Sequence, residues 1–226
     1  MNCVAFLRWR LLVLLLSATY CWPASAGAYD DFLLAVKFDD VDVVRTLLQR
    51  GFDPNTAEEA RGETGIMMAL RDNSMKVFDV LLAAGDLKLE ARARNGDTAL
   101  MIASFMGNLE AVRRLIDAGA EVNQPGWTAL HYAATNGDTD VISLLLENYA
   151  YIDAASPNKT TPLMMAVRSG KIYAVKLLLD EGADLALKNE QGMSALDFAR
   201  HYEHADIVEG LEFRIRQKEQ KAQERR

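Results

Sequence analysis

The stretches DTALMIASFMG (97–107), WTALHYAATNG (127–137) and TTPLMMAVRSG (160–170) repeat one pattern along this chain. In each stretch a threonine is followed by an apolar run with an alanine at its centre, and a glycine closes the run. A repeat of this length indicates one supersecondary unit that is copied and stacked, an architecture that usually works through an extended surface. The central alanine recurs at steps of 34, 34, 30, 33 and 33 residues: Ala35, Ala69, Ala103, Ala133, Ala166 and Ala199.

Each copy carries the signals of two short helices. Pro162 suits the first position of a helix, and residues that tolerate left-handed backbone angles, such as Gly107 and Asn73, predict where the first helix ends. A second apolar pattern with helical spacing follows, as in VISLLL (141–146). We therefore predict an all-α fold of about six helix-turn-helix units. Residues of the types that cap helices stand five places before each alanine: Asp30, Thr64, Thr98, Thr128, Thr161 and Ser194.

With TALHYAATNG (128–137) in its fourth copy and GAEVN (119–123) at the end of its third, the chain resembles the ankyrin repeat family from residue 30 to about residue 213. The resemblance implies a solenoid with short β-hairpin-like fingers, acting as a non-enzymatic protein-binding module. It also implies that His131 bridges its cap threonine and the neighbouring loop. We expect a repeat domain over 27–213, with repeats at about 30–62, 63–96, 97–126, 127–159, 160–192 and 193–213.

Three departures from the repeat pattern are informative. The linker between the third and fourth copies is three residues short, which predicts a truncated finger and a notch with Trp127 at its base. Tyr149 stands where a glycine would close the second helix of the fourth repeat, so that turn is in question. Glu203 replaces the glycine of the sixth repeat, as suits an atypical terminal repeat.

The resemblance implies that partners contact the finger tips and the exposed ends of the first helices. Phe105, Met106 and Trp127 cluster around the shortened finger, and Trp, Tyr and Arg are the residues that dominate interface energetics. In the alternative interpretation, Phe105 and Met106 pack into the core and Trp127 only covers the gap. The candidate partner-binding residues are Phe105, Met106, Trp127, Arg71, Arg94, Asp97, Asn136, Arg168 and Tyr202.

Catalytic patterns are weak in this sequence. His201 and His204 have a spacing that can place two metal ligands on one helical face, but no third ligand accompanies them, so we expect no metal and no cofactor. No serine or cysteine has the local signature of an activated nucleophile, and the glycines punctuate helices rather than form a phosphate loop. We expect no enzyme; a catalytic site would need titratable groups converging in the concave groove.

The N-terminal segment differs from the repeats. Arg8 and Arg10 precede LLVLLLSAT (11–19) and then Ala24-Ser25-Ala26, which predicts a signal peptide over 1–26, cleaved after Ala26. An uncleaved anchor is an alternative, although the apolar run is shorter than the roughly 20 residues that span a bilayer; a lipoprotein at Cys21 is another. We expect no stable membrane span after cleavage. Both cysteines lie in this segment, and a cleaved chain without disulfides fits a bacterial periplasm, with secretion as the alternative.

The charge of the chain is −7 overall, while the tail RIRQKEQKAQERR (214–226) holds six basic and two acidic residues. We predict a basic helical or disordered tail that is solvated; anionic lipid or a second copy are alternative contacts. The acidic body favours a basic partner protein and no nucleic acid. The expected function is a periplasmic, monomeric protein-interaction module. The alternative is a secreted effector or immunity-type protein that inhibits a toxin or a host target.

Overall fold

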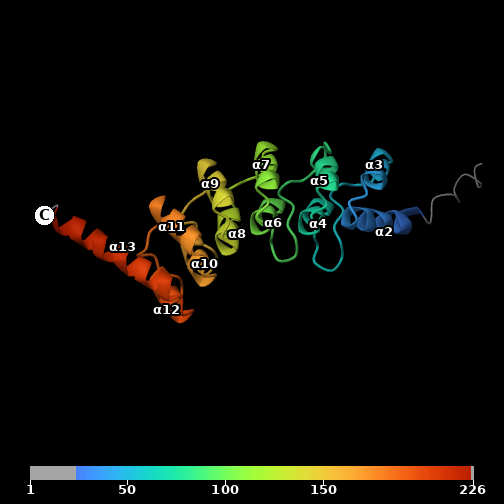
Figure 1. The fold of residues 1–226 in the computed structure, drawn as a ribbon. Coiled ribbons are helices and arrows are strands. Elements are labelled where there is room, and N and C mark those ends of the chain that lie inside the picture. Colours follow the sequence, from blue (N-terminus) through green and yellow to red (C-terminus); the bar gives the residue numbers. More distant parts are fainter. Residues whose placement is uncertain (1–23, 225–226) are drawn as a thin grey trace, which may run out of the picture.

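The computed structural model describes residues 24–224, which form twelve helices in six successive pairs (Figure 1). Among these residues the only β pairing is an isolated bridge between Ala57 and Thr64. The predicted all-α stack of six helix-turn-helix units is confirmed. The pairs are α2 (Ala24–Lys37) and α3 (Val41–Gln49), α4 (Gly65–Arg71) and α5 (Met75–Leu82), α6 (Ala99–Phe105) and α7 (Leu109–Asp117), α8 (Ala129–Asn136) and α9 (Thr139–Glu147), α10 (Pro162–Arg168) and α11 (Ile172–Asp180), and α12 (Ala195–His201) and α13 (Ala205–Glu224).

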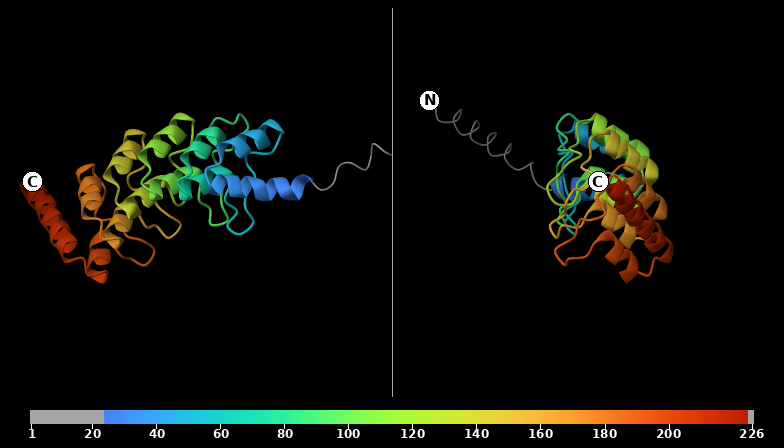
Figure 2. Two further views of the ribbon diagram at one scale, coloured as in Figure 1. Left: turned by 45° about the vertical axis from the view of Figure 1, so that its right-hand side comes forward. Right: turned by 90° about the vertical axis from the view of Figure 1, so that its left-hand side faces the viewer.

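The helices form two rows that run along the stack (Figures 1 and 2). The first helices of the pairs, α2, α4, α6, α8, α10 and α12, each pack on the next and form an inner row. The second helices, from α3 to α11, form an outer row. Loops from each pair to the next project as fingers beside the inner row, and the fingers before α4 and α6 hang below it in Figure 1. We call the surface that the inner row and the fingers present along the stack the groove.

Capping groups and left-handed residues set the ends of the inner helices. The Thr98 hydroxyl accepts from the Met101 N–H at 3.4 Å, and Ser194 and Asp197 cap each other reciprocally, with the Ser194 N–H donating to the Asp197 carboxylate at 2.8 Å. Gly137 ends α8 with φ of +87°, a left-handed angle that glycine adopts without steric cost. At these helix ends the predicted boundaries arise from local hydrogen bonding and backbone freedom, whereas Thr64 precedes α4 without a side-chain cap bond.

The first helix begins earlier than predicted. Asp30 was expected to cap it, but α2 starts at Ala24 and Asp30 lies inside the helix. Residues 24–29 include three alanines, the best helix former, and no finger turn that would stop the helix. The first helix therefore extends beyond the repeat pattern.

Tyr149 and Glu203 keep the turns that glycine was expected to make. Their φ angles are +62° and +59°, which is left-handed backbone that costs a non-glycine residue about 1–2 kcal/mol. The fold therefore imposes the turn on these side chains, and the doubt raised by Tyr149 is resolved in favour of the turn.

A single hydrophobic core runs the length of the stack, from Phe32 to Leu211. At its C-terminal end, Ile207 and Leu211 anchor α13, which continues to Glu224. Arg214 pairs with Asp180, and Lys218 lies 3.7 Å from Asp184. Residues 214–224 of the basic tail are thus helical, and α13 points away from the stack (Figure 2).

The predicted signal peptide lies outside the described residues, apart from Ala24–Ala26 in the first turn of α2. Within residues 24–224, none of the helices combines the length and the apolar character that a membrane crossing requires.

Candidate functional site

The finger between α7 and α8 is built differently from its neighbours. The other fingers close with a backbone hydrogen bond between their two arms, as from the Ala93 N–H to the Asp97 carbonyl at 2.9 Å and from the Ser156 N–H to the Thr160 carbonyl at 3.0 Å. Within residues 121–128, all of which the structure describes, no bond of this kind forms. The shortened linker therefore leaves a finger without the usual backbone closure.

Backbone bonds also join neighbouring fingers on either side of this place. The Arg94 N–H donates to the Arg61 carbonyl at 2.8 Å, and the Glu190 N–H donates to the Asn158 carbonyl at 3.0 Å. The short finger is instead held through Gln124, a buried side chain that donates to Glu121 at 3.0 Å and to Glu90 and accepts from Arg92. A clasp of side chains thus replaces the backbone link.

A pocket of about 250 Å³ opens beside the short finger, where the sequence predicted a notch. Its walls come from α6, α8 and α10, and α8 packs more extensively on α6 and α10 than other inner-row neighbours pack on each other. The Trp127 ring lies edge-on to His131 with centroids 5.1 Å apart, and the Phe105 ring lies edge-on to Tyr132 at 6.3 Å. We call it the central pocket; it is lined by Phe105, Trp127, His131, Tyr132, Thr135, Met165 and Arg168.

A smaller hollow of about 110 Å³, the side pocket, adjoins the central pocket. It is lined by Arg71, Asp97, Ile102, Phe105 and Tyr132, so the two pockets share the Phe105 and Tyr132 rings. The pair forms one short apolar trough along the inner row, with an arginine at each end.

A network of buried charges closes the side-pocket end of the trough. The Tyr132 hydroxyl donates to Asp97, which is 4% exposed, and Arg71 lies 3.7 Å from the same carboxylate. Arg71 also donates through Nε to Glu63 at 2.5 Å, and Glu63 is 1% exposed. The second Glu63 oxygen lies 3.4 Å from the Arg61 guanidinium, in a geometry that is not a hydrogen bond. We call these four residues, Glu63, Arg71, Asp97 and Tyr132, the ion-pair network.

The network fixes the Tyr132 ring. Burial and the hydrogen bond to Asp97 both raise the pKa of Tyr132, so its hydroxyl remains a protonated donor at neutral pH. One wall of the central pocket is therefore held from behind by a charge-assisted hydrogen bond.

His131 holds the floor of the central pocket. Its Nδ1 lies 2.9 Å from the Thr128 hydroxyl and its Nε2 lies 2.9 Å from the Thr160 carbonyl, so Nε2 carries the proton that the carbonyl accepts. Burial lowers the pKa of His131 to about 4, which keeps the ring neutral at pH 7. The bridge between the cap threonine and the next finger is the role that the family resemblance implied.

Five of the nine candidate residues meet in the trough. Phe105, Trp127 and Arg168 line the central pocket, and Arg71 and Asp97 join Phe105 around the side pocket. Asp97 is buried within the ion-pair network, so its carboxylate has little surface left for a partner.

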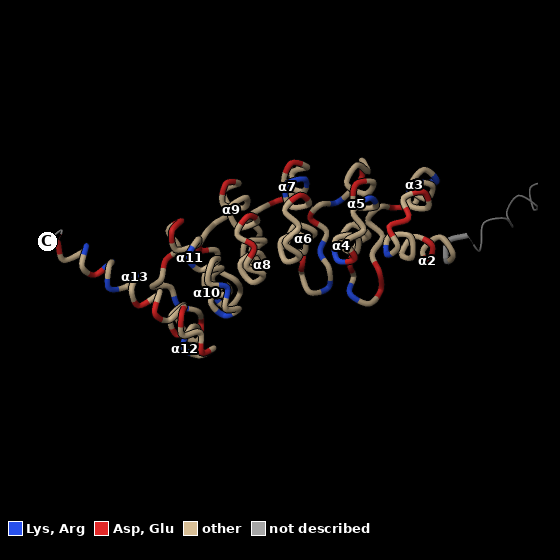
Figure 3. Tube along the Cα trace, viewed as in Figure 1, with Lys and Arg blue, Asp and Glu red and all other residues tan. Residues whose placement is uncertain are grey.

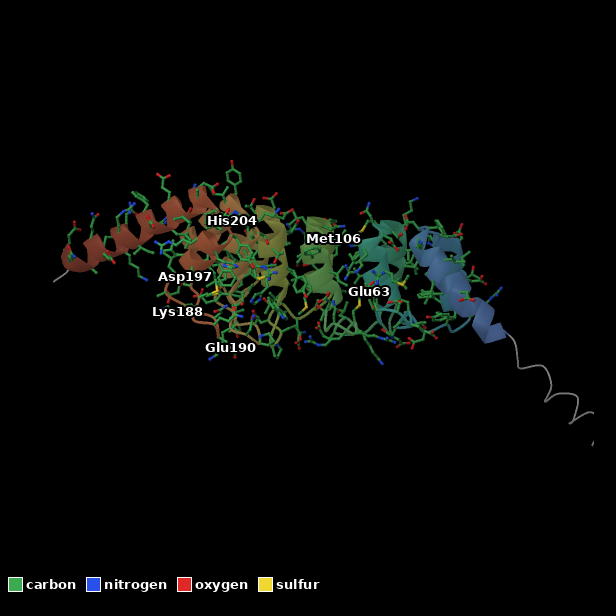
Figure 4. The ribbon with its side chains drawn as sticks, turned by 90° about the horizontal axis from the view of Figure 1, so that it is seen from below. Glu63, Met106, Lys188, Glu190, Asp197 and His204 are labelled. Carbon is green, nitrogen blue, oxygen red and sulfur yellow. The ribbon has the colours of Figure 1, made fainter. Side chains whose placement is uncertain are left out.

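The other four candidates lie elsewhere. Met106 caps the end of α6, and Figure 4 shows it on the side of the stack opposite to Lys188 and Glu190 of the last finger. Arg94 is exposed on a finger, Asn136 ends α8, and Tyr202 caps α12. Phe105 and Met106 are each 44% exposed, so neither is enclosed in the core as the alternative interpretation required.

Sequence reasoning missed two walls of the central pocket, Tyr132 and Met165. Neither was singled out, because each belongs to an apolar helical pattern. Both are the fourth residue after a cap threonine, as is Ile102 in the side pocket. That shared position in the repeat was a signal that could have found them.

The two histidines considered as metal ligands lie at the end of the stack. His201 is edge-on to the Tyr202 ring at 4.9 Å, and the His204 Nε2 lies 3.3 Å from the Arg168 carbonyl. Within residues 24–224, no three His, Cys, Asp or Glu side chains gather as a metal site would need. The chemistry that the trough offers is binding, through aromatic and thioether walls and two guanidinium groups.

The sequence is similar to proteins that contain ankyrin repeats. The family described as ankyrin repeats (3 copies) matches residues 32–125, 88–156, 120–189 and 151–218. The chain is 32% identical over 186 residues to human SH3 and multiple ankyrin repeat domains protein 2, an alignment that covers 80% of this chain and 10% of that protein. It is 32% identical over 176 residues to the mouse B-cell lymphoma 3 protein homolog, covering 75% of this chain and 39% of that protein.

A shorter match, 39% identical over 98 residues, is to the Drosophila palmitoyltransferase Hip14; it covers 42% of this chain and 15% of that protein. The chain spans 39% or less of the length of each of these relatives. The family matches together cover residues 32–218, and the structure over those residues is the helix-pair stack described above. This chain therefore belongs to the ankyrin repeat family.

Proposed function

We propose that this chain binds a partner protein by enclosing one of the partner's apolar side chains in the central pocket. Ankyrin repeats mediate protein–protein interaction. The observation that carries the proposal is the pocket itself, which opens at the one interval where the finger is shortened and has the exposed Phe105 and the half-buried Trp127 in its walls. Exposed aromatic surface of this kind marks interaction sites in soluble proteins.

The size of the pocket supports a side chain as its occupant. Its volume of about 250 Å³ is below the roughly 300–1,000 Å³ that is usual for small-molecule sites. Aromatic anchors in a preformed pocket contribute strongly to protein–protein affinity. Tyr132 and His131 are held by hydrogen bonds, so little ordering entropy is lost when a partner binds.

The export of the chain is part of the proposal. The predicted leader over 1–26, with both cysteines inside it, supports action in a bacterial periplasm. N-terminal sequencing of the protein from a periplasmic extract is expected to begin at Gly27. Recovery of the chain only with its first residues intact, in the membrane fraction, would contradict export by cleavage.

Site-specific crosslinking tests the pocket. Thr135, a half-buried pocket residue, is replaced by photoreactive p-benzoylphenylalanine, and the control chain carries the same group at Tyr173 on α11, which is 77% exposed. Irradiation in the native compartment is expected to capture one partner from position 135 and not from position 173. Trp127→Ala is then expected to weaken binding of that partner by about 30-fold, or about 2 kcal/mol. Equal capture from both positions would contradict the proposal.

A further inference from the structure

We infer that the partner segment in the central pocket carries an aspartate or glutamate close to its apolar side chain. The inference rests on the proposed function and specifies the partner's chemistry. It runs against the expectation from overall charge, since a chain of net charge −7 predicts a basic partner. The charges around the central pocket, unlike the net charge of the chain, favour an acidic partner segment.

Arg168 is the charged group of the central pocket that has no counter-ion. Its side chain is exposed at the rim, and among the described residues no carboxylate oxygen lies within 4.0 Å of its guanidinium. Arg71, at the other end of the trough, is instead paired with both Glu63 and Asp97. The trough therefore has one neutralised arginine and one that is open to a carboxylate.

The groove offers no free carboxylate beside Arg168. Asp97 is the one acidic residue that lines either pocket, and it is committed to Tyr132 and Arg71. Most trough residues come from two positions of the repeat, the fourth and the seventh residue after the cap, and none of the occupants of these positions in the second to sixth repeats is acidic. The occupants are Met68, Ile102, Tyr132, Met165 and Phe198 at the fourth position, and Arg71, Phe105, Thr135, Arg168 and His201 at the seventh.

Several acidic residues of this part of the molecule lie on the outer row, and Glu90 and Glu121 lie at the short finger, where both accept from Gln124. Figure 3 shows red segments at α7, α9 and α11, which include Glu110, Asp140 and Asp180. The fingers on either side of the short one carry Arg94 and Lys159, both exposed and without an ion pair among the described residues. Charges are screened over about 8 Å at physiological salt, so Arg168, the charged residue that lines the central pocket itself, acts on a bound segment more strongly than charges that lie farther away.

An arginine beside apolar walls favours a carboxylate in a specific way. Its planar guanidinium can donate two parallel hydrogen bonds to a carboxylate, whereas a lysine or arginine of the partner would be repelled. The aromatic walls of the pocket exclude water on one side of Arg168, which strengthens this discrimination. The recognised segment is thus an apolar side chain with an acidic residue near it.

Selection from phage-displayed random peptides of twelve residues tests the inference with the full chain as bait. Three baits are compared: the parent, Arg168→Glu, and Arg113→Glu, which makes the same charge change on the outer helix α7. The parent and Arg113→Glu are expected to select peptides with a large apolar residue and a nearby Asp or Glu. Arg168→Glu is expected to keep the apolar residue and to select Lys or Arg in place of the acid.

A selected peptide then gives the size of the effect. Replacing its acidic residue by Asn or Gln is expected to weaken binding to the parent by about 10-fold or more, and to leave binding to Arg168→Glu unchanged or stronger. Selection of apolar residues without acidic enrichment, or the same enrichment with all three baits, would overturn the acidic partner and leave the proposed function standing. If the parent selects no peptide whose binding is lost in Trp127→Ala, both proposals fail.

Discussion

The two ends of the trough differ in chemistry although they occupy equivalent places in the repeat. The residue before the cap threonine is Glu63 or Asp97 at one end, and it is Trp127 at the other. The carboxylates are buried and joined by Arg71 into the ion-pair network, which closes that end. Trp127 has no such partner, and the central pocket opens beside it. In a stack with a constant helical frame, the residue before the cap and the length of the finger thus distinguish the closed segment of the groove from the open one.

The largest effect is expected from Asp97→Leu at the closed end. The substitution removes the carboxylate that accepts from the Tyr132 hydroxyl and is ion-paired with Arg71, and breaking a buried ion pair in this way costs about 3 kcal/mol of unfolding free energy. Urea unfolding measures the loss. Asp79→Leu is the control, because Asp79 is an exposed carboxylate whose pairing with Arg114 should matter by less than about 1 kcal/mol. If Asp97→Leu lowers the free energy of unfolding by as little as Asp79→Leu does, the ion-pair network adds nothing to stability.

Acid is expected to weaken the open end through His131. The pKa of His131 is about 4 in the fold and about 6.5 when unfolded, so below pH 6.5 the unfolded chain binds more protons. The contribution is complete above pH 6.5 and is lost as the pH falls toward 4, with about 2 kcal/mol gone between pH 7.5 and 5. Unfolding free energies of the parent and of His131→Leu, measured across that range, give the difference in slope. Parallel curves would contradict the buried neutral ring.

The wall shared by both pockets gives a smaller effect. Tyr132→Phe removes the hydroxyl that donates to Asp97 and keeps the ring, so we expect a loss of about 1.5 kcal/mol of stability with little change in partner capture at the central pocket. Tyr173→Phe, on an exposed ring, is the control and should be neutral within about 0.5 kcal/mol. A loss of capture with unchanged stability would mean that the hydroxyl contacts the partner and does not support the wall.

The smallest effect concerns the turn that follows α9. Tyr149 has φ of +62° and an exposed side chain, so Tyr149→Gly should relieve strain and add about 1 kcal/mol of stability. Gly119, at the same position of the preceding repeat, has φ of +96°, and Gly119→Ala should cost about the same amount. Thermal midpoints are expected to move in opposite directions by roughly 2–4 °C. A fall for Tyr149→Gly would show that the tyrosine side chain stabilises the turn.

Much of the helical frame was predictable from the sequence because its signals are local. The cap residues, Pro162 and the left-handed glycines act within a few residues of the helix ends that they determine. The start of α2 was not predictable in this way, since Asp30 has the type of a cap but residues 24–29 before it are already helical. Local signals alone do not show which capping residue the chain uses.

The site was predictable only where exposure could be inferred from the repeat. Trp127, Phe105 and Arg168 stand at positions that the family presents to partners, and the three meet in the central pocket. Tyr132 and Met165 look like core residues in a sequence, because an apolar helical pattern does not tell a groove wall from a buried face. The bond from Tyr132 to Asp97 joins residues 35 apart, and it depends on how two repeats stack.

The Gln124 clasp has a consequence for how this surface can change during evolution. The other fingers are joined through main-chain atoms, which a substitution alters little, whereas the short finger is attached through side chains: Gln124 with Glu90 and Arg92 on one side, and Asn123 on the other. A single codon change at position 124 removes the three bonds of the Gln124 side chain, loosens that finger and leaves the helices beneath it unaltered in sequence. Substitutions in the short finger next to the central pocket can therefore change binding preference with the smallest loss of stability in the rest of the stack.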